Sequence, residues 1–169
     1  MAKKNLRFVI ALYVEARQLL EHYNLSKYKL QNCSYKIYFN LDLNIWLVIS
    51  GVGNENANKA TRLLHQNSPK SKKNIWINIG MAGSRNYSLG KIYDVKKITY
   101  LDKCYFTSSL VNHIIKPAEV ICIDRVEKIF PIKNTLYEME TFGFISAAES
   151  ICDRELICSL KIVSDNKKN

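Results

Sequence analysis

The stretch Asn44-Ile45-Trp46-Leu47-Val48-Ile49-Ser50-Gly51-Val52-Gly53 joins an apolar run to a glycine-rich turn, and a helical pattern follows it. The run predicts a buried strand, and the Ala/Leu face of residues 55–66 predicts a helix. A glycine turn between a strand and a helix N-terminus exposes backbone N–H groups that suit an anion. A third glycine is replaced by Asn56 and no Gly-Lys-Ser/Thr follows, so neither nucleotide fingerprint is present. The stretch therefore predicts a strand–turn–helix unit of an α/β fold.

The same alternation of strand and helix patterns extends over the rest of the chain. It predicts an α/β fold, with helices on the faces of a sheet. No repeat, low-complexity segment or linker interrupts the pattern, so residues 1–169 are predicted to form a single domain. Residues 125–130 fit neither pattern. We expect strands at 6–14, 34–40, 44–50, 74–79, 92–101, 105–111, 120–123 and 156–163, and helices at 15–23, 55–66 and 140–152.

The composition is that of a globular protein, with 47% hydrophobic and 24% charged residues among 169. No apolar run approaches the roughly 20 residues that span a bilayer, so no membrane segment is predicted. The apolar start resembles a signal peptide weakly, but Glu15 and Arg17 interrupt it. The five cysteines lack close Cys/His spacing. We therefore expect no metal site, reduced thiols and a cytoplasmic location.

The formal net charge of +10 raises the question of an anionic partner. The lysines, however, cluster at loops and ends, as at 70–73, 96–97 and 167–168. These places are typical of solvated surface, and no helix-turn-helix or aromatic stacking pattern accompanies them. The sequence does not favour nucleic acid as a partner.

Three further segments place polar groups or glycines where a strand is expected to end. Ile79-Gly80-Met81-Ala82-Gly83-Ser84 predicts a second glycine turn, Ser164-Asp165 follows the last strand, and Glu15 follows the first. Ligands of open α/β sheets bind beyond the carboxyl ends of the strands. We therefore expect these groups to meet at one rim of the sheet.

The run Tyr137-Glu138-Met139-Glu140 precedes an almost uncharged helix pattern. Two carboxylates two residues apart point the same way if the backbone is extended. They fit a solvated turn at a helix N-terminus, which the macrodipole favours. They also fit a desolvated pair kept for a ligand or for chemistry. The run by itself leaves both interpretations open.

Taken together, five segments occur in an order that resembles the nucleoside phosphorylase superfamily, and especially its 5′-methylthioadenosine/S-adenosylhomocysteine nucleosidases. The resemblance implies a three-layer α/β/α fold with a central mixed twisted sheet, and an enzyme that cleaves the N-glycosidic bond of a purine nucleoside by hydrolysis. It further implies a small-molecule nucleoside substrate, no cofactor and a homodimer. The five segments are residues 11–15, 50–53, 78–83, 138–140 and 164–165.

The resemblance also implies a role for individual residues. Glu15 matches the glutamate that activates water, and Asp165 matches the acid that protonates the purine N7, with Ser164 beside it. Met139 and Glu140 match residues that hold the ribose, and Glu138 matches the first glutamate of the same motif. Further substrate-binding positions are expected at Ser50, Gly51, Gly53, Met81, Ala82 and Gly83.

The acid role that the resemblance implies for Asp165 requires a protonated carboxyl group. A carboxylic acid that protonates a leaving base near neutral pH must be protonated there, which requires a partly desolvated site. We therefore expect the surroundings of Asp165 to be partly buried.

The sequence also departs from the family pattern. Lys91 follows Gly90 where an acidic residue is usual, and the purine-stacking segment is placed only vaguely, at 120–125. The family normally continues into a C-terminal helix, whereas this chain ends at Asn169, so we expect the fold without that helix.

Two alternatives to hydrolysis remain. A phosphorylase would bind inorganic phosphate as co-substrate at the Ser50–Gly53 turn, with Arg17 or Arg85 as cations. An inactive relative would bind nucleosides without turnover.

Overall fold

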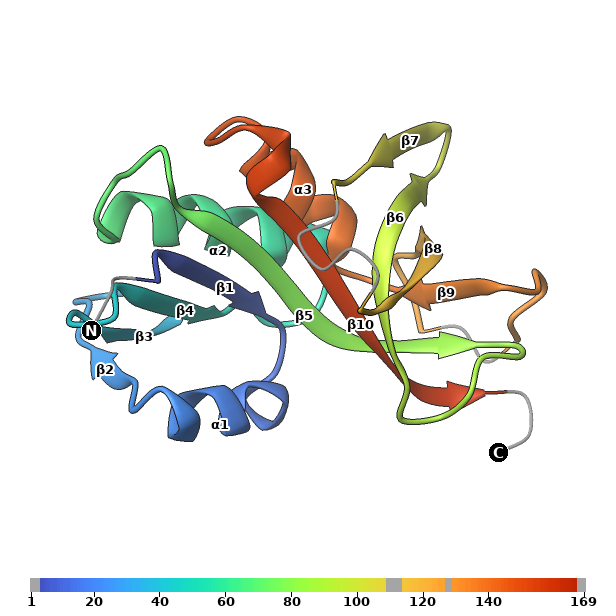
Figure 1. The fold of residues 1–169 in the computed structure, drawn as a ribbon, viewed down its shortest axis with the longest axis horizontal. Helices are drawn as coiled ribbons and strands as arrows, with labels where there is room; N and C mark the ends of the chain where they lie inside the picture. The colour runs from blue at the N-terminus through green and yellow to red at the C-terminus, as the bar shows by residue number, and fades with distance from the viewer. Residues whose placement is uncertain (1–3, 109–113, 127–128, 167–169) are drawn as a thin grey trace.

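Strands of one sheet run through the whole protein, with helices on both of its sides (Figure 1). The computed structural model describes residues 4–108, 114–126 and 129–166. The strands are β1 (Leu6–Ile10), β2 (Ser26–Tyr28), β3 (Lys36–Asn40), β4 (Ile45–Ile49), β5 (Ile75–Ser84), β6 (Ile92–Tyr100), β7 (Lys103–Phe106), β8 (Lys116–Cys122), β9 (Thr135–Glu138) and β10 (Ile157–Asn166). The helices are α1 (Tyr13–His22), α2 (Asn54–Asn67), α3 (Thr141–Ala148) and the short 3₁₀ helix η1 (Arg154–Leu156).

The sheet has an open half and a closed half. In the open half, β1 lies parallel between β4 and β5, and β3 and β2 continue it antiparallel. In the closed half, β5 pairs with both β10 and β9, and β6 and β8 complete the ring β5–β10–β6–β8–β9. The carboxyl ends of β1, β4, β5 and β10 consequently lie at one edge of the sheet.

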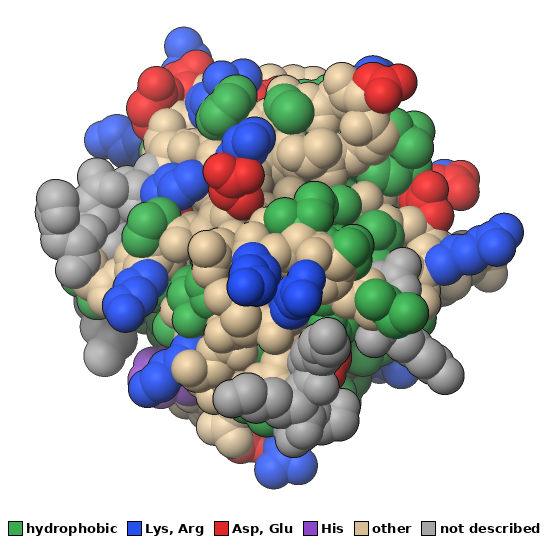
Figure 2. Space-filling model, turned by 90° about the vertical axis from the view of Figure 1, so that its right-hand side faces the viewer, with side chains coloured by type: hydrophobic (Ala, Val, Ile, Leu, Met, Phe, Trp, Pro, Cys, Tyr) green, Lys and Arg blue, Asp and Glu red, His purple; other side chains and the backbone are tan. Residues whose placement is uncertain are grey.

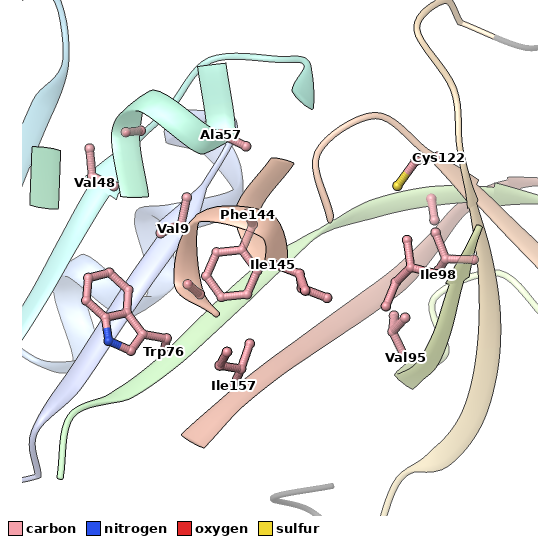
Figure 3. Close-up of a cluster of buried hydrophobic side chains, with 14 of the residues drawn as sticks. Val9, Val48, Ala57, Trp76, Val95, Ile98, Cys122, Phe144, Ile145 and Ile157 are labelled. Atoms are coloured by element: carbon pink, nitrogen blue, oxygen red, sulfur yellow. The ribbon is translucent and has the colours of Figure 1, made fainter. Parts of the chain in front are cut away.

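Separate apolar clusters hold the layers together. Phe8, Ile10, Ala16 and Leu20 pack α1 onto one side of the open half. The other cluster lies between the sheet and the pair α2 and α3, and it extends into the closed half (Figure 3). Such burial stabilises by about 25 cal/mol per Å² of apolar surface. The three-layer α/β/α arrangement with a mixed sheet is thus confirmed.

Several predicted element bounds are wrong. The strand expected at 6–14 ends at Ile10 and α1 begins at Tyr13, because a continuous apolar run does not reveal where strand changes to helix. The helix expected at 140–152 ends at Ala148. The patterns also missed β2 and β9. Of the strand expected at 105–111, only 105–106 belong to β7, and 109–111 lie outside the described residues, as do Lys167 and Lys168.

Two expected strand ends lie inside strands. Gly80 and Gly83 belong to β5, which continues to Ser84 because β10 and β9 pair with it. Asp165 likewise belongs to β10. Pairing between distant segments therefore removes the second glycine turn.

The surface carries its basic side chains at separate places. On the face in Figure 2, Lys and Arg side chains are interspersed with hydrophobic and acidic ones. Within the described part of the chain, no helix is long and apolar enough to cross a membrane.

Candidate active site

A pocket of about 270 Å³ opens at the carboxyl edge of the sheet. It lies between the first turn of α1, the ends of β5 and β10, and the β9–α3 turn. Four of its lining side chains are carboxylates, and no Lys or Arg belongs to the described lining, although the chain as a whole is basic. The lining residues are Ala11, Leu12, Glu15, Val52, Met81, Ala82, Gly83, Ile123, Val126, Phe130, Tyr137, Glu138, Met139, Glu140, Ser164 and Asp165.

Glu15 is held by the backbone on two sides. Its Oε2 accepts a hydrogen bond from the N–H of Leu12 (2.9 Å), and its Oε1 accepts one from the N–H of Met81 in β5 (3.1 Å). Each oxygen keeps a further lone pair for a water or a hydroxyl. These contacts orient a carboxylate into the pocket at a half-buried position.

A β-bulge aims the Ser164-Asp165 pair at the pocket. Val163 pairs with Ala82 but Asp165 pairs with Gly83, so Ser164 is an extra residue in β10. Bulges re-aim side chains and are frequent next to active sites. The Ser164 hydroxyl donates to Oδ2 of Asp165 (2.9 Å). Asp165 is exposed, so the partly buried surroundings expected for an acid are absent around it.

Phe130 forms the apolar wall beside Asp165. Its ring is buried and lies against Gly83, where a Cβ would overlap it, and the centroid of the Tyr137 ring is 5.3 Å away. Gly83 therefore leaves the space that the ring occupies. A flat aromatic wall next to a carboxyl group suits a planar heterocycle.

Glu140 closes the opposite side of the pocket. It is 7% exposed, and its Oε1 accepts a hydrogen bond from the N–H of Gly53 (3.0 Å). Burial raises the pKa of Glu140, Lys161 opposes that change, and Glu138 adds to it, so the net pKa lies above the ordinary value.

Glu138 makes an ion pair beneath the pocket. Its Oε2 lies 2.8 Å from Nζ of Lys161, and the two side chains are 1% and 0% exposed. Burial alone would raise the pKa of Glu138, but Lys161 and the Cys122 thiol lower it below the ordinary value. Burial would lower the pKa of Lys161, but Glu138 and Glu140 raise it. Both partners are therefore charged.

Solved structures with this arrangement of strands and helices are enzymes. An MTA/SAH nucleosidase superposes with a TM-score of 0.79 at 18% identity, covering 97% of this chain and 82% of that one. A 5′-methylthioadenosine nucleosidase of Arabidopsis thaliana gives 0.74 at 19% identity, covering 97% and 82%. A futalosine hydrolase of Helicobacter pylori gives 0.73 at 14% identity, covering 94% and 88%.

The chain has the nucleoside phosphorylase fold. No family model and no curated protein matches the sequence, so the likeness is one of fold.

Within this nucleoside phosphorylase fold, most of the predicted site residues share one pocket, including Glu15, Glu140 and Asp165. The exceptions belong to the glycine turn. Ser50 and Gly51 border a different hollow, with Tyr35 and Asn56, and Gly53 borders another, with Tyr100 and Asp124. Val52 enters the main pocket instead. The predicted residues in the main pocket are Glu15, Met81, Ala82, Gly83, Glu138, Met139, Glu140, Ser164 and Asp165.

Phe130 and Lys161 belong to the site region but were not predicted from the sequence. Phe130 lies in the segment 125–130 that fitted no pattern, and three bulky apolar residues in that segment were the available signal. Lys161 interrupts an otherwise apolar strand, and a lone lysine at such a position signals a buried counter-charge. The vague stacking segment 120–125 contributes Ile123 to the pocket.

Proposed function

We propose that this protein hydrolyses the N-glycosidic bond of a purine nucleoside of the methylthioadenosine/S-adenosylhomocysteine type. The observation that carries the proposal is the meeting of Glu15, Glu140 and Asp165 in one pocket beside an aromatic wall. They come from α1, the β9–α3 turn and β10, so their meeting depends on the fold. The nucleosidases with this fold support the same chemistry.

The proposed reaction needs an acid, a base and support for the sugar. Asp165 is exposed in the free protein, and a purine bound against the Phe130 ring would cover it. Asp165 then donates a proton to N7 of the purine while the bond between C1′ and N9 breaks. Glu15 takes a proton from the water that attacks C1′, and Glu140 holds the ribose hydroxyls. The products are the free base and the sugar with a hydroxyl at C1′. Acid and base assistance of this kind contributes typically 10²–10⁴-fold.

The occupied N–H groups of the glycine turn favour water over phosphate as the nucleophile. The N–H of Gly51 donates to the carbonyl of Ala11 (3.0 Å), and that of Gly53 donates to the Glu140 carboxylate (3.0 Å). A phosphate bound by these two N–H groups would have to displace their present acceptors, one of which is a carboxylate. The cations considered for it have other contacts, Arg17 with Glu21 and Arg85 with the carbonyl of Pro131.

The decisive experiment measures adenine release from 5′-methylthioadenosine with and without inorganic phosphate. Hydrolysis predicts equal rates in the two conditions and free methylthioribose as the product. Strict dependence on phosphate would instead establish a phosphorylase. Nucleoside binding without turnover would establish an inactive relative.

The proposed function also concerns the cofactor, the compartment and the oligomeric state of the protein. The reaction requires no cofactor, since water is the co-substrate. Free thiols at all five cysteines favour a reducing compartment such as the cytoplasm. Exposed apolar side chains of Leu12, Val52 and Met81 at the pocket favour a homodimer that covers them, which light scattering would test.

Replacing Glu15 by Gln should lower kcat by about 10²-fold or more with a smaller change in KM, because an amide cannot accept the proton from water. Steady-state kinetics on methylthioadenosine would measure this. Glu21→Gln, on the exposed side of the same helix, is the matched control and should keep wild-type rates. Similar rates in the two variants would remove Glu15 from the mechanism.

Replacing Gly83 by Ala should weaken adenine binding by about tenfold, because the new Cβ overlaps the Phe130 ring and lies 2.6 Å from Oδ1 of Asp165. Stacking of a base on an aromatic side chain is worth about 1–3 kcal/mol. Calorimetric titration with adenine would measure the loss. The buried Phe130 ring must move to admit this Cβ, so a lower melting temperature should accompany the loss of affinity. Wild-type affinity for adenine would contradict the role of Phe130 as the wall of the purine site.

A further inference from the structure

Lys161 and Glu138 form a buried ion pair that the proposed chemistry does not use. We propose that they are positioning residues, whose ion pair holds the β9–α3 turn so that Glu140 faces the sugar, and whose lysine supplies positive charge beneath the acidic pocket. This inference rests on the proposed function and assigns Glu138 a role other than contact with substrate.

Both carboxylate oxygens of Glu138 are engaged by other groups of the protein. Oε2 accepts hydrogen bonds from the N–H groups of Glu140 (2.9 Å) and Thr141 (2.9 Å) and contacts Lys161 (2.8 Å). Oε1 accepts from the thiol of Cys122 and more weakly from Thr141 (3.2 Å). A carboxylate with this many partners has little capacity left for a ligand. It fixes the backbone on both sides of Met139 and at the start of α3.

A layer of buried polar side chains lies under the β9–α3 turn. The Thr141 hydroxyl donates to Oδ1 of Asn78 (3.2 Å) and lies 3.3 Å from the Ser159 hydroxyl, while the Asn78 amide donates to the carbonyl of Val9 (3.0 Å). All of these side chains are buried. The layer thus ties the turn to β1, β5 and β10, and a satisfied buried network of this kind specifies one arrangement.

Lys161 supplies positive charge near the acidic pocket. A Cβ built on Gly80 would lie 3.2 Å from Nζ of Lys161 and 3.8 Å from Oε1 of Glu15, so the lysine lies near Glu15. The charge of Lys161 also acts on Glu140. Charged or titratable groups face Glu140 from three elements, namely Lys161 on β10, Glu138 on β9 and Glu15 on α1. Cys122 of β8 faces Glu138. Lys161 is the cation among these groups.

Because Lys161 and Glu138 carry opposite charges, removing one or the other should shift the pH profile of kcat/KM in opposite directions. Lys161→Gln removes the cation, which favours the protonated form of Glu140, so the acid limb of kcat/KM moves to higher pH. Glu138→Gln removes an anion and leaves the cation, so the acid limb moves to lower pH. A purely structural pair would lower the melting temperature and leave the limb in place. If the folded single variants keep the acid limb of kcat/KM at the wild-type pH, the charge role of Lys161 is overturned.

Two double variants test positioning without an unpaired buried charge. Replacing both partners by apolar residues is often neutral for folding, whereas removing one partner is costly. Glu138→Gln/Lys161→Gln keeps an acceptor for the two N–H groups, and Glu138→Met/Lys161→Met removes it. We expect KM for methylthioadenosine to be about tenfold higher in the Met/Met variant than in the Gln/Gln variant, since small misplacements near the reacting centre are expensive.

Free adenine serves as the control ligand, because we expect it to bind against the Phe130 ring, on the side of the pocket opposite Glu140. Both double variants should bind it with wild-type affinity by calorimetry. Equal KM values in the two doubles would overturn the positioning role. A wild-type protein that neither cleaves nor binds methylthioadenosine would overturn the proposed function itself, so the two failures are distinguishable.

Discussion

Replacing Asp165 by Asn should lower kcat/KM for methylthioadenosine by about 10²–10⁴-fold, because an amide cannot deliver a proton to N7. The β-bulge at Ser164 and the Ser164 hydroxyl should hold the amide where the carboxyl stands. Asp165 is exposed, so the fold should tolerate the change. We therefore expect an unchanged melting temperature together with a loss of adenine release.

A matched control is Asp102→Asn, in the exposed turn between β6 and β7. It makes the same chemical change away from the pocket and should retain full activity. Adenine affinity measured in both variants reports whether the purine wall is intact. Wild-type turnover in the Asp165 variant would rule out its role as the acid.

Replacing Gly143 by Ala should destabilise the protein by about 3 kcal/mol or more, although alanine is the better helix former. Gly143 lies in α3 where α2 crosses it, and a Cβ there would overlap the carbonyl oxygen of Asn54 and lie 2.8 Å from its Cα. Backbone cannot rotate away as a side chain can. The Asn54 side chain also accepts the Gly143 N–H (2.9 Å), so separating the helices breaks this bond.

Thermal or urea unfolding would measure the loss. Gly90→Ala is the comparison, because a Cβ there meets nothing and the cost arises from its φ of +71° alone. That strain should cost about 1 kcal/mol. If the two variants lose the same free energy of unfolding, α2 and α3 can move apart at lower cost than their close contact implies.

The site residues fall into two groups by how well sequence could predict them. Glu15, Glu140 and Asp165 stand in short recurring segments, so order along the chain was enough to propose them. Phe130 and Lys161 stand in no such segment. What they do depends on neighbours far away in sequence, Gly83 for the ring and Glu138 for the lysine. Local patterns can mark Phe130 and Lys161 as unusual, but they do not identify these distant partners.

Hydrophobic periodicity is a local property, so it was enough to predict the alternation of strands and helices, the helix faces and the α/β class. The tertiary structure was needed to show that Gly80, Gly83 and Asp165 lie inside strands, since their backbone groups pair across the ring β5–β10–β6–β8–β9. It also decided that Glu138 is paired with Lys161 while Glu140 faces the pocket. Glu138 and Glu140 share one local sequence pattern, but segments distant in sequence supply different partners: Glu138 is engaged by Lys161, whereas Glu140 accepts the N–H of Gly53 at the pocket.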